Sequence, residues 1–250
     1  MDRLAIIALM CLCAVVLGSR AGAAPGDLGE KQIRITWFGH AFFLVESKET
    51  RVAMDPVNES VGYPIPDVSA DVLLVTHGHG DHNNVAAVKG GPTVVSGTGP
   101  HEAAGISFKG IATKHFDDPA NARRGDNTIF VWQQSGITLA HCGDLGHPLT
   151  DAQVAEIGDV DVLMIPVGGH FTIDAQEARR VVHQLKPKVI LPMHYRTEAT
   201  SSRLPIVGVD DFVGLMKDEA TVENDGKHSA TLTADALPQD KPRVIVLAWK

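Results

Sequence analysis

Short apolar runs separated by turn-forming residues fill most of the chain. The runs at 33–38 and 41–45 are split by Gly39-His40, and this pattern predicts a β-hairpin. The continuous apolar run at 72–75 stops at Thr76-His77 and is typical of a buried strand. The same reasoning predicts further short strands at 52–54, 93–95, 128–132, 137–140, 160–165, 189–191 and 244–249.

Helical patterns are fewer and lie mostly in the second half of the chain. The strongest covers 174–185 and ends before Pro187. Asp174 can cap its first turn, and Glu177, three residues later, completes a capping box. Paired strands with helices interspersed later favour an α+β fold, in which helices cover mixed sheets. Shorter helices are predicted at 83–89, 151–157 and 210–216.

The N-terminal segment has the order of a secretory signal peptide. Asp2-Arg3 precede an apolar run at 4–17, and Ala21-Gly22-Ala23 follows as a small-residue cleavage site. The alternative is an uncleaved membrane anchor, but the run is shorter than the ~20 residues that a bilayer span needs. We therefore expect export to the periplasm or the extracellular space, with no stable membrane span after cleavage.

Cleavage would divide the chain into a signal peptide at 1–23 and one mature domain at 24–250. Mass spectrometry of the exported protein should then show an N-terminus near Ala24, and an intact Met1 would contradict the cleavage. Cleavage also removes two of the three cysteines. Because only Cys142 remains, the mature chain can form no internal disulfide, and its core or a bound metal must stabilise it.

The composition is that of an ordinary globular domain. Apolar residues make up 44% and charged residues 21% of the 250 residues, which is enough for a sizeable core. The formal net charge is -8 and no basic stripe is visible, so a nucleic-acid partner bound through its phosphates is disfavoured. We expect a small-molecule substrate instead. The sequence carries no signal for an oligomeric state.

The run His77-Gly78-His79-Gly80-Asp81-His82 is the densest concentration of potential metal ligands in the chain. Three imidazoles and one carboxylate stand together at the end of a predicted buried strand. These groups suit zinc, iron or manganese. The two intervening glycines let the backbone turn tightly enough for the side chains to converge. The pattern therefore predicts a metal site.

Two more histidines follow predicted strands. His141 comes directly after 137–140 and is followed by Gly143-Asp144, and His194 comes after 189–193. Loops present strand-end residues from a rigid base, so both histidines are candidate ligands. The alternative for each is a buried core histidine with satisfied hydrogen bonds.

The order of these residues resembles the metallo-β-lactamase superfamily, whose fold is a four-layer αββα sandwich. The run at 77–82 is similar to the H-x-H-x-D-H motif of that family, and the remaining motifs have counterparts in the same order: Asp55, His141, Asp144 and His194. The local sequence is similar to the subgroup that contains ascorbate-6-phosphate lactonase. This similarity lies in Phe38-Gly39-His40-Ala41, Gly143-Asp144-Leu145-Gly146-His147 and Gly168-Gly169-His170-Phe171.

The resemblance implies a site for two divalent ions, with zinc favoured and manganese or iron as alternatives. A metal-bound hydroxide, oriented by Asp81, would cleave an ester, lactone, amide or phosphodiester bond. Asp55 would hold the ligand loop through hydrogen bonds. The ligand set divides into His77, His79 and His141 for the first ion, Asp81, His82 and His194 for the second, and Asp144 as the bridge.

Three further histidines, His40, His115 and His170, stand at turns or strand ends. We expect all three to bind substrate, and His115 and His170 also to donate a hydrogen bond or a proton in catalysis. The alternative is that they are surface turn residues. Cys142 lies between a predicted ligand and the predicted bridge. We expect it to be buried beneath the site, with metal ligation as the alternative.

Two other functions compete with hydrolysis. A non-catalytic metal-binding protein would keep ions for structure or storage, but a full ligand set with pocket histidines favours an enzyme. A one-iron redox or thioester enzyme of the same fold would not need Asp81, His82 and His194 together. The sequence therefore predicts an exported metal-dependent hydrolase with a two-ion site.

Overall fold

The computed structural model describes residues 28–115 and 125–250. The predicted signal peptide and its cleavage site lie outside these ranges. Every site residue predicted from the sequence lies inside them. Within the same ranges, no helix is both long enough and apolar enough to cross a bilayer.

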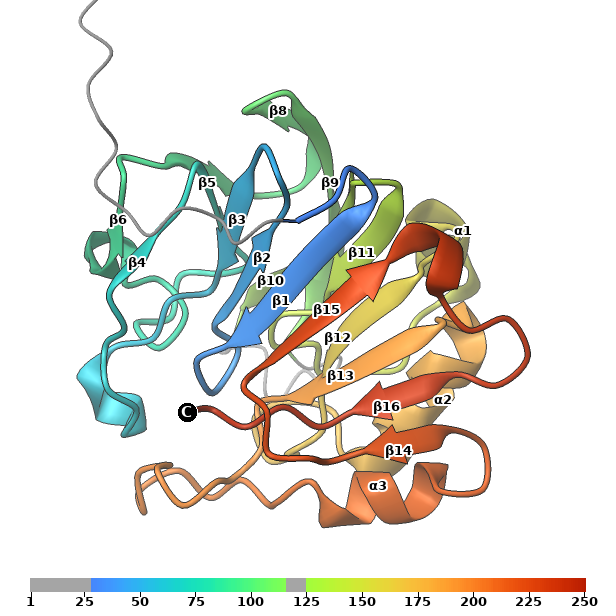
Figure 1. Ribbon diagram of the computed structural model, residues 1–250. Helices are drawn as coiled ribbons and strands as arrows, with labels where there is room; N and C mark the ends of the chain where they lie inside the picture. Colours follow the sequence, from blue (N-terminus) through green and yellow to red (C-terminus); the bar gives the residue numbers. More distant parts are fainter. Residues whose placement is uncertain (1–27, 116–124) are drawn as a thin grey trace, which may run out of the picture.

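Two β-sheets pack face to face at the centre of the fold (Figure 1). The first sheet has 6 strands in the order β15 (Ser229–Thr233), β1 (Gln32–Trp37), β2 (Phe43–Glu46), β3 (Arg51–Met54), β5 (Val72–Val75) and β7 (Thr93–Ser96). The second sheet has 8 strands in the order β14 (Thr221–Glu223), β16 (Arg243–Ile245), β13 (Val189–Met193), β12 (Val162–Pro166), β11 (Ile137–His141), β10 (Asp126–Gln134), β9 (Ile106–Lys114) and β8 (Gly99–Ala103). The predicted hairpin is confirmed as β1 and β2.

Both sheets combine antiparallel and parallel strands. In the first sheet β1, β2 and β3 are antiparallel, whereas β3, β5 and β7 run parallel. In the second sheet β9, β10 and β11 are antiparallel, whereas β11, β12 and β13 run parallel. Parallel neighbours end at the same edge of a sheet, and such edges are where loops build binding sites. The residues that follow β5, β11 and β13 are therefore placed to meet.

The central strands β2 and β5 of the first sheet are buried on both faces, which explains their continuous apolar runs. In β5, Val72 and Leu74 pack into the core between the two sheets. Leu73 and Val75 point the other way, into a second apolar cluster. A strand with two buried faces has no polar alternation, and 72–75 was predicted as a buried strand on this pattern.

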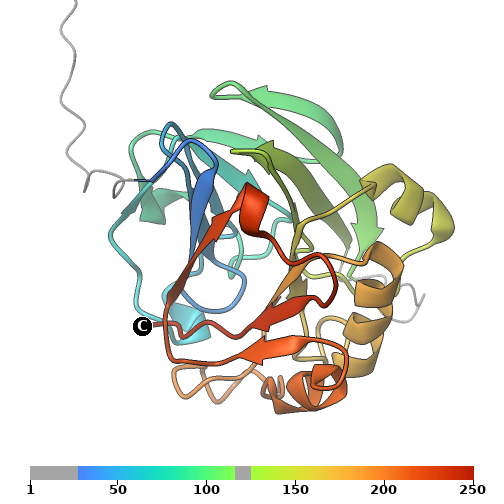
Figure 2. The same cartoon turned by 45° about the vertical axis from the view of Figure 1, so that its right-hand side comes forward.

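The α-helices of the described chain lie beside the second sheet: α1 (Asp151–Ile157), α2 (Ala175–Leu185) and α3 (Asp210–Met216) (Figure 1 and Figure 2). The predictions at 151–157, 174–185 and 210–216 are confirmed. The Asp174 side chain accepts hydrogen bonds from the first-turn amides, and the Glu177 side chain accepts one from the Asp174 amide, as the capping box predicts.

The outer face of the first sheet is covered without an α-helix in the described residues. The segment between β3 and β7 forms 3₁₀ turns at Glu59–Val61 and Val85–Ala87 and the short parallel pair β4 (Val68–Ser69) and β6 (Val88–Lys89). The prediction of an α-helix at 83–89 is therefore wrong, because this segment contains only a single 3₁₀ turn at Val85–Ala87 and ends in the strand Val88–Lys89. The α+β class is confirmed, but among residues 28–115 and 125–250 only the second sheet carries α-helices on its outer face.

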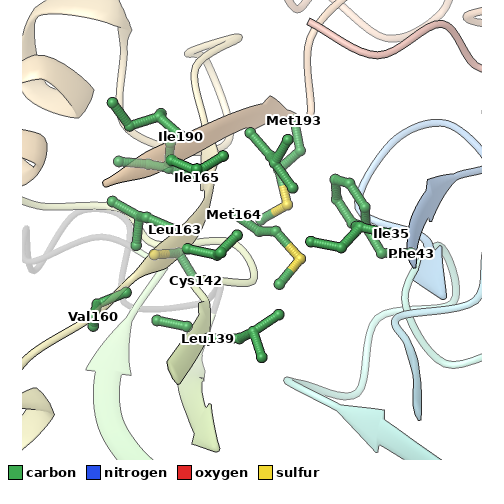
Figure 3. Packing of buried hydrophobic residues seen from close by; sticks show 14 of the residues in the cluster. Ile35, Phe43, Leu139, Cys142, Val160, Leu163, Met164, Ile165, Ile190 and Met193 are labelled. Atoms are coloured by element: carbon green, nitrogen blue, oxygen red, sulfur yellow. The ribbon is translucent and has the colours of Figure 1, made fainter. Parts of the chain in front are cut away.

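Cys142 is buried in the main apolar cluster, and its side chain lies on the same side of the second sheet as Leu163, away from Ile35 and Phe43 of the first sheet (Figure 3). Its side chain is fully buried and the residue is a free cysteine. Burial raises the pKa of the thiol, which disfavours the thiolate that would bind a metal. The prediction that Cys142 is buried is confirmed.

Candidate metal centre

The centre lies where backbone hydrogen bonds join the two sheets. The Thr128 amide of β10 donates to the Thr76 carbonyl at 3.0 Å, directly after β5. The His194 amide, after β13, donates to the His40 carbonyl between β1 and β2 at 3.0 Å. These contacts bring segments that are far apart in sequence to one edge, so that their side chains form a single site.

Six histidines at this edge form two groups of three. His77, His79 and His115 form the first group, and His40, His82 and His194 form the second. Within each group, one potential ligand atom per residue lies within 4.8 Å of the others. All of these residues are buried except His79, which is exposed at the opening of the site.

The carboxylate of Asp144 lies between the two groups and turns one oxygen toward each. Its Oδ2 is 3.5 Å from His115 Nε2 and 3.8 Å from His77 Nε2. Its Oδ1 is 3.1 Å from His82 Nε2 and 3.4 Å from His194 Nε2. A carboxylate in this position can bind two cations at once, with one oxygen for each.

Asn127 fixes the backbone that carries Asp144. The Asp144 amide donates to Asn127 Oδ1 at 3.0 Å, while Asn127 Nδ2 donates to the Cys142 carbonyl at 2.9 Å. Gly143 between them has φ +53°, and a Cβ there would lie 2.4 Å from Asn127 Oδ1. Only glycine fits this position. Asn127 was not predicted from the sequence, because its role depends on a contact between separate strands.

Asp55 fixes the orientation of two candidate ligand histidines. Its Oδ1 accepts the Thr76 amide at 2.9 Å, and its Oδ2 accepts the Thr76 hydroxyl at 2.6 Å. The same Oδ2 accepts Nδ1–H of His82 at 2.9 Å. Because the Thr76 hydroxyl hydrogen points to Asp55, its oxygen accepts Nδ1–H of His77 at 3.0 Å. Both histidines therefore turn Nε2 toward the site, as metal ligands do.

His115 occupies the place that the sequence assigned to His141. Its Nδ1–H donates to the Phe171 carbonyl at 3.1 Å, so its Nε2 is unprotonated. This Nε2 faces Nε2 of His77 at 3.1 Å. Two nitrogen lone pairs at this distance repel each other, whereas a cation that accepted both lone pairs would remove this repulsion.

His141 lies outside both groups, which corrects the expected ligand set. It is fully buried. Its Nε2–H donates to the Ala41 carbonyl at 3.0 Å, and its Nδ1 accepts the Gly143 amide at 3.2 Å. Both ring nitrogens are thus used by the backbone. His141 ties β11 to the turn before β2 and has no nitrogen left for a metal.

The remaining predicted residues lie at different depths. Asp81 has a side chain that is 31% exposed, and its Oδ2 is 3.4 Å from His40 Nε2 and 4.0 Å from His82 Nε2. His40 is buried beneath it rather than in the open pocket. His170 is exposed and stacks edge-on against Phe171, apart from both histidine groups.

Burial keeps most of these imidazoles neutral. It lowers the pKa of His77 to about 3, aided by the charge of His82. It also lowers the pKa of His115. Burial acts in the same direction on His82, but Asp144 and Asp55 outweigh it and raise the pKa of His82 well above its usual range. Neutral imidazole is the form that binds metal.

The buried polar atoms at this centre fit divalent cations. His82 Nε2, Asp144 Oδ1 and His194 Nδ1 are buried without a hydrogen-bond partner in the described structure. Unpaired buried polar atoms are costly and are rare in folded proteins. Imidazole nitrogens with a shared carboxylate are the ligands that zinc, manganese and iron accept.

A cavity of about 370 Å³ opens beside His77. Its lining includes the small or polar residues Gly78, Asn83, Ser96 and Thr128. This volume is within the range of small-molecule sites, ~300–1,000 Å³. The space next to His77 is therefore large enough for a small substrate.

Two packed sheets with histidines and aspartates gathered at one edge define a class of metal-binding β-sandwich. The family model described as a β-lactamase superfamily domain matches residues 34–194. A UPF0173 metal-dependent hydrolase of Carboxydothermus hydrogenoformans is 32% identical over 215 residues, which is 75% of this chain and 92% of that protein. A similar protein of Pyrococcus abyssi is 29% identical over 76% of this chain and 95% of its own length.

Solved structures agree with these relatives. A Thermotoga maritima protein, described as a Zn-dependent hydrolase of the metallo-β-lactamase superfamily, is 38% identical with a TM-score of 0.69. The match covers 86% of this chain and 99% of that one. The chain therefore belongs to the metallo-β-lactamase superfamily. The prediction of a metal-dependent hydrolase with this fold is confirmed, and the lactonase-like subgroup stays a prediction.

Proposed function

We propose that this chain hydrolyses a small-molecule substrate at a centre of two divalent ions. The observation that carries the proposal is the position of Asp144, whose two oxygens face separate groups of histidines. A one-ion enzyme would need no buried carboxylate shared in this way. The first ion would be held by His77, His79 and His115, the second by Asp81, His82 and His194, and both by Asp144.

The donor set favours zinc, with manganese and iron as alternatives. Two such ions lower the pKa of a water molecule and stabilise negative charge on the substrate, which suits an ester, lactone, amide or phosphodiester bond. The residues of the chain determine the shape of the substrate site. Asp81 and His79 stand at the opening, and exposed His170 is available to contact a substrate. The signal-peptide pattern at 2–24 supports the further proposal that this reaction takes place after export.

Elemental analysis and a substrate screen test the function directly. Freshly purified protein should contain about two equivalents of metal per chain. It should also cleave at least one ester, lactone, amide or phosphodiester probe, and a chelator should abolish this activity until metal is returned. A chain that holds no metal, and takes up none when ions are added, would overturn the proposal.

His115 and His141 form a matched pair for testing the ligand set. His115→Ala should lower the metal content to about one ion and reduce turnover by about 100-fold or more, because a ligand is lost. His141→Gln keeps an amide donor near the Ala41 carbonyl, so the folded variant should hold about two ions although its melting temperature falls. Metal loss in His141→Gln with full occupancy in His115→Ala would show that our assignment is reversed.

A further inference from the structure

His40 is the buried group at this centre for which the proposed reaction has no use. The residue is only 1% exposed, and both of its ring nitrogens are buried without a hydrogen-bond partner. A neutral imidazole has one donor and one acceptor, and leaving them unpaired in the interior is costly. The nearest charged group is Asp81, whose Oδ2 is 3.4 Å from His40 Nε2.

The backbone holds the His40 ring in place. His40 has φ 54°, in the left-handed region that a residue with a side chain rarely adopts. Its carbonyl accepts two hydrogen bonds at 3.0 Å, from Trp37 Nε1 and from the His194 amide. Gly39 before it packs against Tyr63 so closely that a Cβ would lie 2.3 Å from the ring. Strained, over-determined backbone of this kind is typical of functional sites.

The spacing of the rings argues against His40 as a metal ligand. The ring centroids of His77 lie 4.7 Å from those of His79 and His115, as expected for imidazoles arranged around a common point. The centroids of His40 and His194 are only 3.9 Å apart, with an interplanar angle of 38°. His40 therefore lies against the face of His194 instead of beside it around a shared ion.

We infer that His40 is a positioning residue for the second ion: its Nε2–H holds Oδ2 of Asp81, and its ring supports His194 from behind. This inference rests on the proposed two-ion function. Asp81 needs such a partner because its side chain is 31% exposed and could otherwise turn toward solvent. Groups that orient a ligand in this way are typically worth 10–100-fold in metal affinity or activity.

Two amide variants separate the donor from the bulk of the ring. The amide nitrogen of glutamine lies close to the position of a histidine Nε2, whereas that of asparagine lies near Nδ1. His40→Gln can therefore still donate to Asp81, and His40→Asn cannot. Asparagine tolerates the left-handed backbone better than glutamine. His40→Asn should therefore be the more stable of the two variants, whereas His40→Gln should be the one that retains affinity for the second ion.

The experiment is a titration of the metal-free mature protein with Zn²⁺, by calorimetry and chelator competition, alongside thermal unfolding. His40→Ala and His40→Asn should bind the first ion like the wild type and the second ion 10–100-fold more weakly. His40→Gln should bind the second ion within a few fold of the wild type. The ratio of second-ion to first-ion affinity is the readout, and a merely structural role would not move it selectively.

Each other outcome overturns the inference. Normal second-ion affinity in His40→Ala would show that Asp81 needs no partner. Complete loss of the second ion in both His40→Ala and His40→Gln would make His40 a ligand. Equal rescue by Gln and Asn would exclude a donor at Nε2. A wild-type chain that binds fewer than two ions would overturn the proposed function itself, which the wild-type titration shows before any variant is compared.

Discussion

Asp144→Asn should empty both metal positions and reduce hydrolysis by about 10³-fold or more, equivalent to about 4 kcal/mol of transition-state stabilisation. The amide has the shape of the carboxylate, and the backbone hydrogen bond to Asn127 remains. What is lost is the negative charge that faces both histidine groups. A neutral amide cannot balance two divalent cations in a buried site, so neither ion should survive purification.

Elemental analysis and turnover of one preparation check this result. Asp235→Asn is a suitable control, because Asp235 is an exposed carboxylate paired with Lys31, far along the chain from the centre. It should retain about two ions and full activity. If Asp144→Asn lost only one ion, the carboxylate would serve a single position and the shared-bridge geometry would be contradicted.

The sequence predicted those candidate ligands that are close together or follow clear strands. The run 77–82 is informative because its spacing is local and β5 before it is a continuous apolar run. His194 and Asp144 also follow buried strands and reach the centre. For these residues, knowing where the strand ends is nearly sufficient to place the side chain.

The structure places His115, and not the predicted His141, at the centre, and this difference shows the limit of prediction from local sequence. β9 (Ile106–Lys114) was not predicted, although Ser107, Phe108 and Lys109 alternate between exposed and buried. The alternation breaks at Gly110, which is buried next to another buried residue. Without that strand, nothing in the sequence ranked His115 above His141 as a candidate ligand. Which of two histidines turns into the centre depends on contacts across the sheets, and no local pattern encodes them.

Backbone strain is a second feature that the sequence does not show. Four candidate site residues have left-handed backbone without being glycine: His40 at φ 54°, Asp55 at 48°, His170 at 60° and His194 at 52°. Such conformations cost about 1–3 kcal/mol each and persist only when their surroundings impose them. Three of them, His40, Asp55 and His194, lie together at the candidate metal centre, and this is independent support for a functional site there.

The α-helices were predicted well for the opposite reason. The N-terminal ends of α1 and α2 are set by capping boxes, which involve residues only three apart. The cover of the first sheet has no such local signal. Its apolar side chains, including Val57, Val61 and Tyr63, stand in irregular segments that are ordered only by packing on the sheet.

Asp55→Ala should destabilise the metal-free protein by about 3–5 kcal/mol, as expected when one partner of a buried charged network is removed. Asp55 is fully buried, and its loss leaves the Thr76 amide, the Thr76 hydroxyl and Nδ1–H of His82 without their acceptor. The same change frees His82 and His77 from their fixed tautomers. Metal affinity should therefore fall together with stability.

Urea unfolding of the chelator-treated protein measures the structural part, and repetition with zinc measures the part linked to metal. Asp71→Ala is the matched control, because Asp71 accepts a backbone hydrogen bond from Arg51 away from the centre. It should cost about 1–3 kcal/mol and leave the zinc-dependent gain in stability unchanged. An Asp55→Ala variant as stable as the Asp71 variant, with an equal gain from zinc, would mean that Asp55 does not orient the ligand loop. Loss of the zinc gain in Asp55→Ala alone would show that one buried carboxylate links the folding of this edge to its capacity to hold metal.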